Sequence, residues 1–215
     1  MATFFLPSCK INKAFPAEDA RLAEYLSERW NIPALGCCRQ ARQKFSQEDT
    51  AVVVCHTCAS IMEESSAAGN VVYAWEYLDR DENFVFPDYQ GEAITVQDCF
   101  MARERERVQQ AVRSLLRKMN FTVVELPAKG EKADFCGLRT LAPLKANQEL
   151  APKHFCQPGT FTPLQEDERV KFLKEYTANY RTARAVTYCG ACRGAMLLGG
   201  AKAVHLLELL FPDAK

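Results

Sequence analysis

Two similar stretches decide the fold of this chain: Ala51-Val-Val-Val-Cys55-His-Thr-Cys58-Ala-Ser-Ile-Met62 and Ala185-Val-Thr-Tyr-Cys189-Gly-Ala-Cys192-Arg-Gly-Ala-Met196. In each, a short run with β-branched residues enters a Cys-x-x-Cys pair, and small residues that suit the start of a helix follow. We therefore expect both pairs where a strand gives way to a helix. Self-similarity of this kind indicates an internal duplication.

The repeat extends on both sides of the cysteine pairs. Downstream, Val72-Tyr-Ala-Trp-Glu76-Tyr-Leu78 parallels Val204-His-Leu-Leu-Glu208-Leu-Leu210. Upstream, Thr3-Phe-Phe-Leu-Pro-Ser-Cys9 and Ala93-Ile-Thr-Val-Gln-Asp-Cys99 are apolar strands that end in a cysteine. Amphipathic helices are expected after them, near residues 17–29 and 102–119, with a further strand at 121–126. The order predicts an α/β fold of two tandem Rossmann-like βαβ modules with parallel strands.

The boundary between the modules is expected near residues 80–92, a polar segment followed by a linker-like stretch from Pro87 to Gly91. The predicted domains are residues 1–86, called half one below, and residues 87–215, called half two. Each is predicted to be a cysteine-rich iron-sulfur module.

Composition excludes several classes of function. Lys plus Arg and Asp plus Glu number 27 each, so no net field attracts nucleic acid or an anionic membrane surface. The run Arg103-Glu-Arg-Glu-Arg107 alternates in sign, which is typical of a solvated helix face. Residues 1–7 lack the features of a signal peptide, and no run approaches the ~18 apolar residues of a membrane span. We expect a soluble cytoplasmic protein without a nucleic-acid partner or direct membrane insertion.

Ten cysteines in a reducing compartment point to metal binding or redox chemistry rather than to structural disulfides. Half one contains Cys9, Cys37, Cys38, Cys55 and Cys58, and half two contains Cys99, Cys136, Cys156, Cys189 and Cys192. Carboxyl ends of parallel strands meet at one edge of a sheet, and Cys9, Cys55, Cys99 and Cys189 follow such ends. All ten cysteines are therefore candidate metal ligands.

Thiolate-only sites select iron-sulfur clusters or zinc over harder ions. Zinc normally uses two short Cys-x-x-Cys pairs, whereas each half has one. The adjacent side chains of Cys37 and Cys38 diverge, which suits a cluster with several irons better than one tetrahedral ion. Ligand chemistry favours iron-sulfur over zinc, and a metal-free dithiol stays open as a third interpretation.

The order of a cysteine, then a Cys-Cys pair, then Cys-x-x-Cys, given twice, resembles the cysteine-rich (CCG) domain family, and above all its paired domains in heterodisulfide reductase. The same domain occurs in related lactate-utilisation and anaerobic glycerol-3-phosphate dehydrogenase subunits. The resemblance covers nearly the whole chain. It implies two [4Fe-4S] clusters, non-cubane in half one, with a disulfide substrate cleaved between them. Carried over by residue, it implies the five half-one cysteines for the first cluster and Cys99, Cys136, Cys189 and Cys192 for the second.

The chain departs from the family pattern at both cysteine pairs. Arg39 follows Cys38 where relatives usually have glycine, and Phe135 stands in place of the first cysteine of the half-two pair. Half two therefore has four matched ligands. Cys156 is a candidate fifth ligand, and an ordinary cubane cluster is the alternative.

Other residues near the predicted ligands have less specific roles. Arg39 and Arg193 could hold an acidic substrate or neutralise cluster charge, with surface salt bridges as the competing interpretation. We expect His56 to be an exposed spacer, with a hydrogen bond to cluster sulfur as the alternative. His205 is expected to be a core histidine.

The leading hypothesis is an iron-sulfur redox subunit that reduces a small disulfide. The chain has no Gly-x-Gly-x-x-Gly motif and no Cys-x-x-Cys-x-x-Cys run, so electrons must come from a ferredoxin-type or flavoprotein partner. An electron-transfer subunit without a substrate site is the principal rival. A thioredoxin-like dithiol at Cys189 and Cys192 and a zinc scaffold are the remaining alternatives.

Overall fold

A computed structural model describes residues 1–212 and contains two parallel β-sheets. The sheet of half one has the order β1 (Thr3–Leu6), β2 (Thr50–Val53), β3 (Asn70–Tyr73). The sheet of half two has the order β5 (Thr122–Glu125), β4 (Ala93–Val96), β6 (Arg184–Thr187), β7 (Ala203–His205). All neighbouring strands are parallel, which confirms the predicted α/β fold of two Rossmann-like modules.

The helices follow the same duplicated plan. Half one contains α1 (Cys9–Ala14), α2 (Pro16–Trp30), α3 (Cys38–Ala41), α4 (His56–Ser65) and α5 (Ala74–Arg80), with a 3-10 turn, η1 (Arg42–Lys44), after α3. Half two contains α6 (Glu106–Lys118), α7 (Lys145–Leu150), α8 (Pro152–Phe155), α9 (Glu166–Thr177), α10 (Gly190–Leu198) and α11 (Leu206–Leu210). Its 3-10 turns are η2 (Phe100–Ala102) and η3 (Gly130–Lys132). The helices predicted near 17–29 and 102–119 correspond to α2 and α6.

The duplication is visible in details that the sequence motifs do not contain. The left-handed residue Asn31, at φ 54°, ends α2, and Asn120, at φ 59°, follows α6. Asparagine tolerates this conformation better than most residues. After each asparagine the chain runs beside the first strand of its module: Ala34 bridges to Phe5 in half one, and β5 pairs with β4 in half two. Ala34 thus occupies the position of β5.

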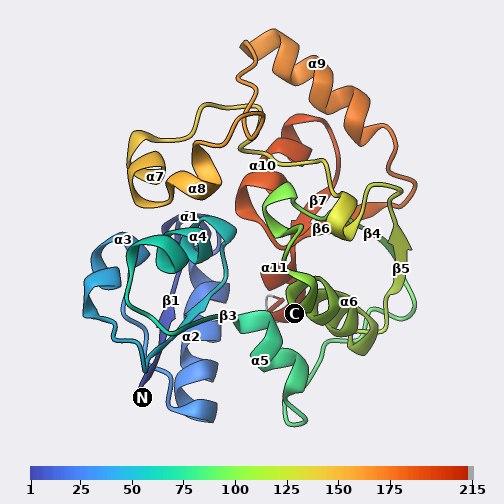
Figure 1. Ribbon diagram of the computed structural model, residues 1–215. Coiled ribbons are helices and arrows are strands. Elements are labelled where there is room, and N and C mark those ends of the chain that lie inside the picture. Colours follow the sequence, from blue (N-terminus) through green and yellow to red (C-terminus); the bar gives the residue numbers. More distant parts are fainter. Residues whose placement is uncertain (213–215) are drawn as a thin grey trace.

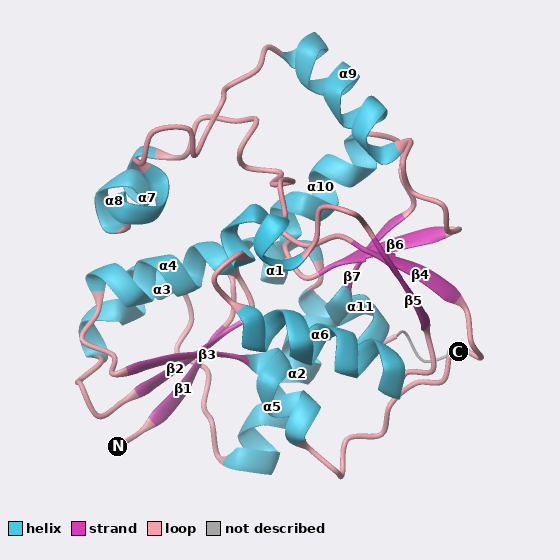
Figure 2. Ribbon diagram, turned by 45° about the vertical axis from the view of Figure 1, so that its right-hand side comes forward, coloured by secondary structure: helices cyan, strands magenta, loops and turns pink. Residues whose placement is uncertain are grey.

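The halves pack through two equivalent pairs of helices. Helix α5 of half one packs on α6 of half two, and α11 of half two packs on α2 of half one. Figures 1 and 2 show these four helices between the two sheets. The β3–α5 and β7–α11 units also have the same helix cap. Glu76 accepts a hydrogen bond from the amide of Tyr73 before α5, and Glu208 accepts one from the amide of His205 before α11.

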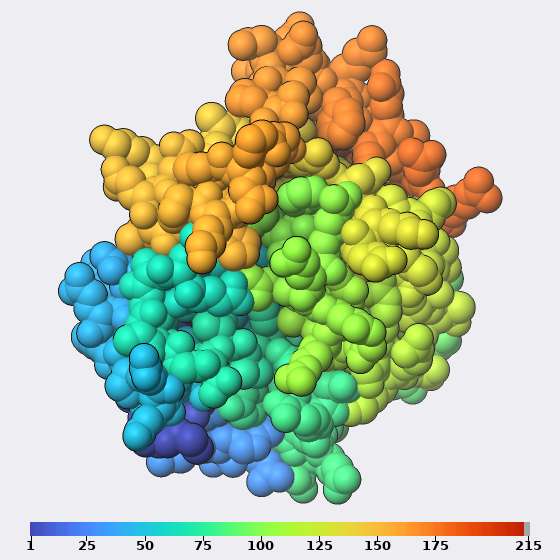
Figure 3. Space-filling view, in the orientation of Figure 1, coloured from blue at the N-terminus to red at the C-terminus, as the bar shows by residue number. Residues whose placement is uncertain are grey.

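One segment of half two crosses to half one. Helices α7 and α8 pack on α4, and the space-filling view shows this yellow and orange segment against the blue and cyan residues (Figure 3). The carboxylate of Glu64 accepts hydrogen bonds from the amides of Lys153, at 2.9 Å, and His154, at 3.2 Å. The sheets therefore separate at the predicted boundary while residues 145–155 lie on the other half. Division into two independent domains stays a prediction.

The charged run before α6 differs from the expected solvated helix face. Helix α6 begins at Glu106, so most of the run precedes it. The Arg105 side chain is only 14% exposed and pairs with Glu63 of half one at 2.5 Å. For Arg105 the prediction was wrong, because alternating charge cannot reveal an ion pair with a distant carboxylate, whereas Glu104, Glu106 and Arg107 are exposed.

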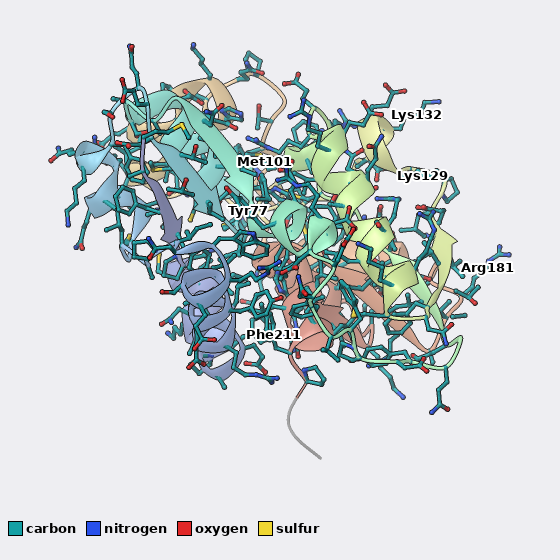
Figure 4. All side chains as sticks on the ribbon, turned by 90° about the horizontal axis from the view of Figure 1, so that it is seen from below. Tyr77, Met101, Lys129, Lys132, Arg181 and Phe211 are labelled. Atoms are coloured by element: carbon teal, nitrogen blue, oxygen red, sulfur yellow. The ribbon has the colours of Figure 1, made fainter. Side chains whose placement is uncertain are left out.

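Basic side chains at the periphery do point outward: Lys129, Lys132 and Arg181 lie along the outer edge of half two (Figure 4). Among the helices of residues 1–212, none has the length and apolar character to cross a membrane.

Candidate metal centres

Four thiols converge in the interior of half two. They belong to Cys99 after β4, Cys136 in the loop after η3, and Cys189 and Cys192 after β6. The sulfurs of Cys99, Cys136 and Cys192 all lie within 4.8 Å of one another, with Cys99 and Cys136 3.6 Å apart. Cys99 and Cys192 are 0% exposed. Such a group has the geometry and the burial to hold a metal ion.

Backbone contacts fix the half-two cysteines. Cys189 is the N-cap of α10, so the free amides and the dipole at the start of that helix favour negative charge on sulfur. The amide of Phe100 donates to the carbonyl of Phe135 at 2.7 Å, which holds the Cys136 loop beside Cys99. The strand end, the helix start and the loop therefore all direct sulfur to one place.

The half-one cysteines gather at the equivalent edge of their sheet, more openly. Cys38 and Cys55 lie near enough to Cys58 to raise its pKa, and the sulfurs of Cys9 and Cys37 lie 4.0 Å apart. Cys55 is the N-cap of α4, as Cys189 is of α10. Cys9 is exposed, whereas Cys38 and Cys58 are buried. This second group is the one that reaches the surface.

Protons are shared unequally among the thiols. The hydrogen bond from Cys58 lowers the pKa of Cys55 to about 6, although burial opposes the shift. Hydrogen bonds from Cys192 and Cys99 lower the pKa of Cys189. Separate hydrogen bonds from the same two residues lower the pKa of Cys136. Metals bind thiolates, so these sulfurs lose their protons to solvent more readily than ordinary thiols when an ion binds.

His56 is a residue of the site whose position was wrongly predicted from the sequence. It is 1% exposed rather than an exposed spacer, because half two packs over the start of α4. One of its ring nitrogens lies within 4.8 Å of the sulfurs of Cys99 and Cys189. Nδ1 is hydrogen-bonded to the Tyr73 hydroxyl at 2.7 Å, and Nε2 has no hydrogen-bond partner among residues 1–212. A half-one side chain thus lies among the half-two thiols.

His205 is a core histidine, as predicted, at 0% exposure. Its Nδ1 accepts from the amide of Leu207 at 3.2 Å, and its ring stacks on Phe15 with centroids 5.3 Å apart. Burial lowers the pKa of His205 to about 3, so the ring is neutral and carries its hydrogen on Nε2. That N-H also has no partner among the described residues.

The other predicted site residues lie outside the two thiol groups. Cys156 is exposed, with Sγ 3.9 Å from the carbonyl of Gln148, and it lies apart from the other thiols. The groups of metal-binding geometry found in residues 1–212 include neither Cys156 nor any half-one cysteine. Arg39 donates to the side chain of Asn147 in α7. Arg193 pairs with Glu208 at 2.9 Å. Both arginines are engaged in contacts within the protein.

A cavity of about 400 Å³ reaches the half-two thiols. Cys136, Arg139, Thr140, Phe172 and Tyr176 are among the residues that line it. Its walls are mostly apolar, with Arg139 and Asp134 as the charged residues and Phe172 exposed at the surface. Small-molecule sites commonly combine an apolar wall with a few polar groups in this way.

Fold and site together define a duplicated α/β protein with two adjoining groups of cysteines, of which the half-two group, with His56 beside it, has the geometry to hold a metal ion. No protein-family model matches the chain, and no curated protein matches it.

Proposed function

We propose that this chain is an iron-sulfur redox protein that holds one cluster in each half and reduces a disulfide. The observation that carries the proposal is the buried convergence of Cys99, Cys136, Cys189 and Cys192. The half-one cysteines gather at the equivalent edge of their sheet in a looser group, in which the sulfurs of Cys9 and Cys37 are 4.0 Å apart. This arrangement is the one implied by the resemblance to the paired cysteine-rich domains of heterodisulfide reductase.

The donor sets favour clusters over single ions. Half one offers five thiols, more than a tetrahedral zinc ion uses, and two of them come from adjacent residues. Half two offers four thiols, one for each iron of a cubane [4Fe-4S] cluster. The half-one centre is accordingly proposed as non-cubane and the half-two centre as a four-thiolate cluster.

The cavity beside Cys136 is the proposed substrate site. Reduction of a disulfide takes two electrons and two protons and yields two thiols. Bound iron-sulfur clusters would supply the electrons one at a time. In this scheme the apolar walls contact the disulfide. Arg139, whose guanidinium also donates to the carbonyls of Asp134 and Gly159, pairs with a carboxylate of the substrate, while the Tyr176 hydroxyl holds the Asp134 carboxylate.

Electrons are proposed to enter at half one from a ferredoxin-type or flavoprotein partner. Cys9 is exposed, so a partner can approach the half-one centre closely. The two centres adjoin, because the charge on Cys189 is near enough to raise the pKa of Cys55, although hydrogen bonding from Cys58 outweighs this effect. One centre thus faces the surface and the other faces the cavity.

Anaerobic reconstitution tests the clusters. We expect about eight iron and eight sulfide per chain, with cluster signals in electron paramagnetic resonance. Cys99→Ala should remove the half-two centre and about half of the iron, whereas Cys156→Ala, the matched control, should keep it all. A colourless protein without iron would disprove the proposal, and bound zinc would replace it with a scaffold role.

Turnover tests the substrate site. Reduced protein should cleave a dicarboxylate disulfide anaerobically, and Arg139→Gln should slow this reaction more than about tenfold while sparing a neutral disulfide. Arg181→Gln, at the exposed periphery, is the control (Figure 4). Equal slowing with both disulfides would remove Arg139 from the binding role.

An electron-transfer subunit is the second candidate function. The burial of the half-two thiols favours it, because a relay needs no contact with substrate. Intact clusters with no reaction toward any small disulfide would select this alternative. The same burial argues against a thioredoxin-like dithiol, which needs an accessible nucleophilic thiolate.

A further inference from the structure

The half-two centre has four thiols where half one has five, and the missing donor position coincides with Phe135 in the sequence. The structure brings a different donor to this centre. His56 belongs to half one, yet one of its ring nitrogens lies within 4.8 Å of Cys99 and Cys189 sulfur. Two sulfurs and a nitrogen at such separations are compatible with shared metal coordination.

The hydrogen bond of the ring engages one nitrogen and leaves the other without a partner among the described residues. Nδ1 is paired with the Tyr73 hydroxyl at 2.7 Å. With Nδ1-H as the donor, the Nε2 lone pair stays free, buried and without a partner among residues 1–212. Histidines that bind metals almost always have their second nitrogen held in this way.

We propose that His56 is a ligand of the half-two metal centre through Nε2, supplied across the interface by half one. The inference rests on the proposed function, because it adds one donor to the four-thiol cluster. A neutral histidine adds this donor without adding negative charge to the cluster.

Cys55, the residue before His56, connects this ligand to the half-one centre. Cys55 precedes His56 and belongs to the half-one group, so a single peptide bond joins a donor of each centre. Spin coupling between the two reduced clusters is therefore expected.

His205 has the opposite tautomer and serves as the matched control. Its Nδ1 accepts from the Leu207 amide, so its unpaired Nε2 carries a hydrogen and has no lone pair for a metal. A residue of the same type and burial thus lacks the coordinating atom.

The test is pulsed electron paramagnetic resonance of the reconstituted protein in which Cys37→Ser and Cys38→Ser remove the half-one cluster. We expect strong coupling to a directly bound nitrogen, changed by ¹⁵N-histidine labelling. The coupling should persist in His205→Asn and in His154→Gln, which identifies His56 without altering it. His56→Ala should abolish the coupling while the four thiols keep the cluster in place.

The outcomes separate the two proposals. A half-two cluster without strong histidine coupling overturns the ligand assignment and leaves the proposed function standing. Coupling that vanishes in His205→Asn also overturns it. A protein that binds no iron overturns both.

Discussion

The backbone amide of Gly137 donates to the sulfur of Cys192 across 3.5 Å, which fastens the loop of Cys136 to helix α10. A Cβ at residue 137 would overlap the carbonyl of Ala191. The close approach of loop to helix therefore requires glycine, and it places Cys136 among the other half-two thiols.

Gly137→Ala should displace Cys136 and abolish the half-two centre. About half of the iron should be lost after anaerobic reconstitution, while the half-one signals remain. Gly194→Ala in helix α10, against which Gly137 packs, is the control, since no neighbouring atom of the described residues lies within 4 Å of the added methyl group. It should keep all the iron and stabilise the helix by about 0.5–1 kcal/mol. Full iron content in Gly137→Ala would show that the loop has room to move.

Arg113→Met should destabilise half two strongly. The Arg113 guanidinium donates to Asp98 at 2.7 and 3.1 Å and to Glu125 at 2.8 Å. Burial alone would raise the pKa of Asp98, but the hydrogen bonds from Arg113 outweigh it and lower the pKa. Loss of the partner leaves a buried charge, at a cost of about 3–5 kcal/mol in the free energy of unfolding.

Urea unfolding of the metal-free protein measures this effect. Lys145→Met removes an exposed ion pair with Glu149 and should cost no more than about 0.5 kcal/mol. Similar costs for the two variants would show that Asp98 finds another partner.

Metal-free protein should lose stability as pH falls below about 6.5 because His205 resists protonation. Above that pH the imidazole is neutral in both states and makes no difference. Between the ordinary value and its folded pKa of about 3, only the unfolded chain takes up the proton. The free energy of unfolding then falls by up to about 1.4 kcal/mol per pH unit.

His205→Asn removes this proton while keeping an acceptor for the Leu207 amide. Its free energy of unfolding should fall less steeply than the wild type's between pH 6.5 and 5, where few carboxylates titrate. Parallel curves for the two proteins would mean that His205 ionises freely in the fold.

Sequence patterns predicted the features that lie within one module. A β-branched run before each cysteine pair indicates a strand buried in its own sheet, and both strands, β2 and β6, are present. The strand position at Ala34 was missed, because Pro33 and a single isolated bridge give no alternating pattern.

Features made by contact between the halves could not be predicted in this way. His56 looks like an exposed spacer because its neighbours in sequence say nothing of half two packing above it. The ion pair of Arg105 with Glu63 and the packing of α7 and α8 on α4 were not predicted either, because they too are contacts between the halves. That Nε2 of His56 is buried without a hydrogen-bond partner in residues 1–212 can be recognised only when distances across the interface are known.

Alkylation of cysteines distinguishes ligands from bystanders without any substitution. Cys9 and Cys156 are the exposed thiols of residues 1–212, so both should react first with iodoacetamide in the metal-free protein. After reconstitution Cys9 should react more than about tenfold more slowly, because iron would hold its thiolate. Cys156 should keep its rate, since it lies outside both thiol groups. Mass spectrometry of the labelled peptides measures both rates, and protection of Cys156 by the cluster would restore it as the tenth ligand.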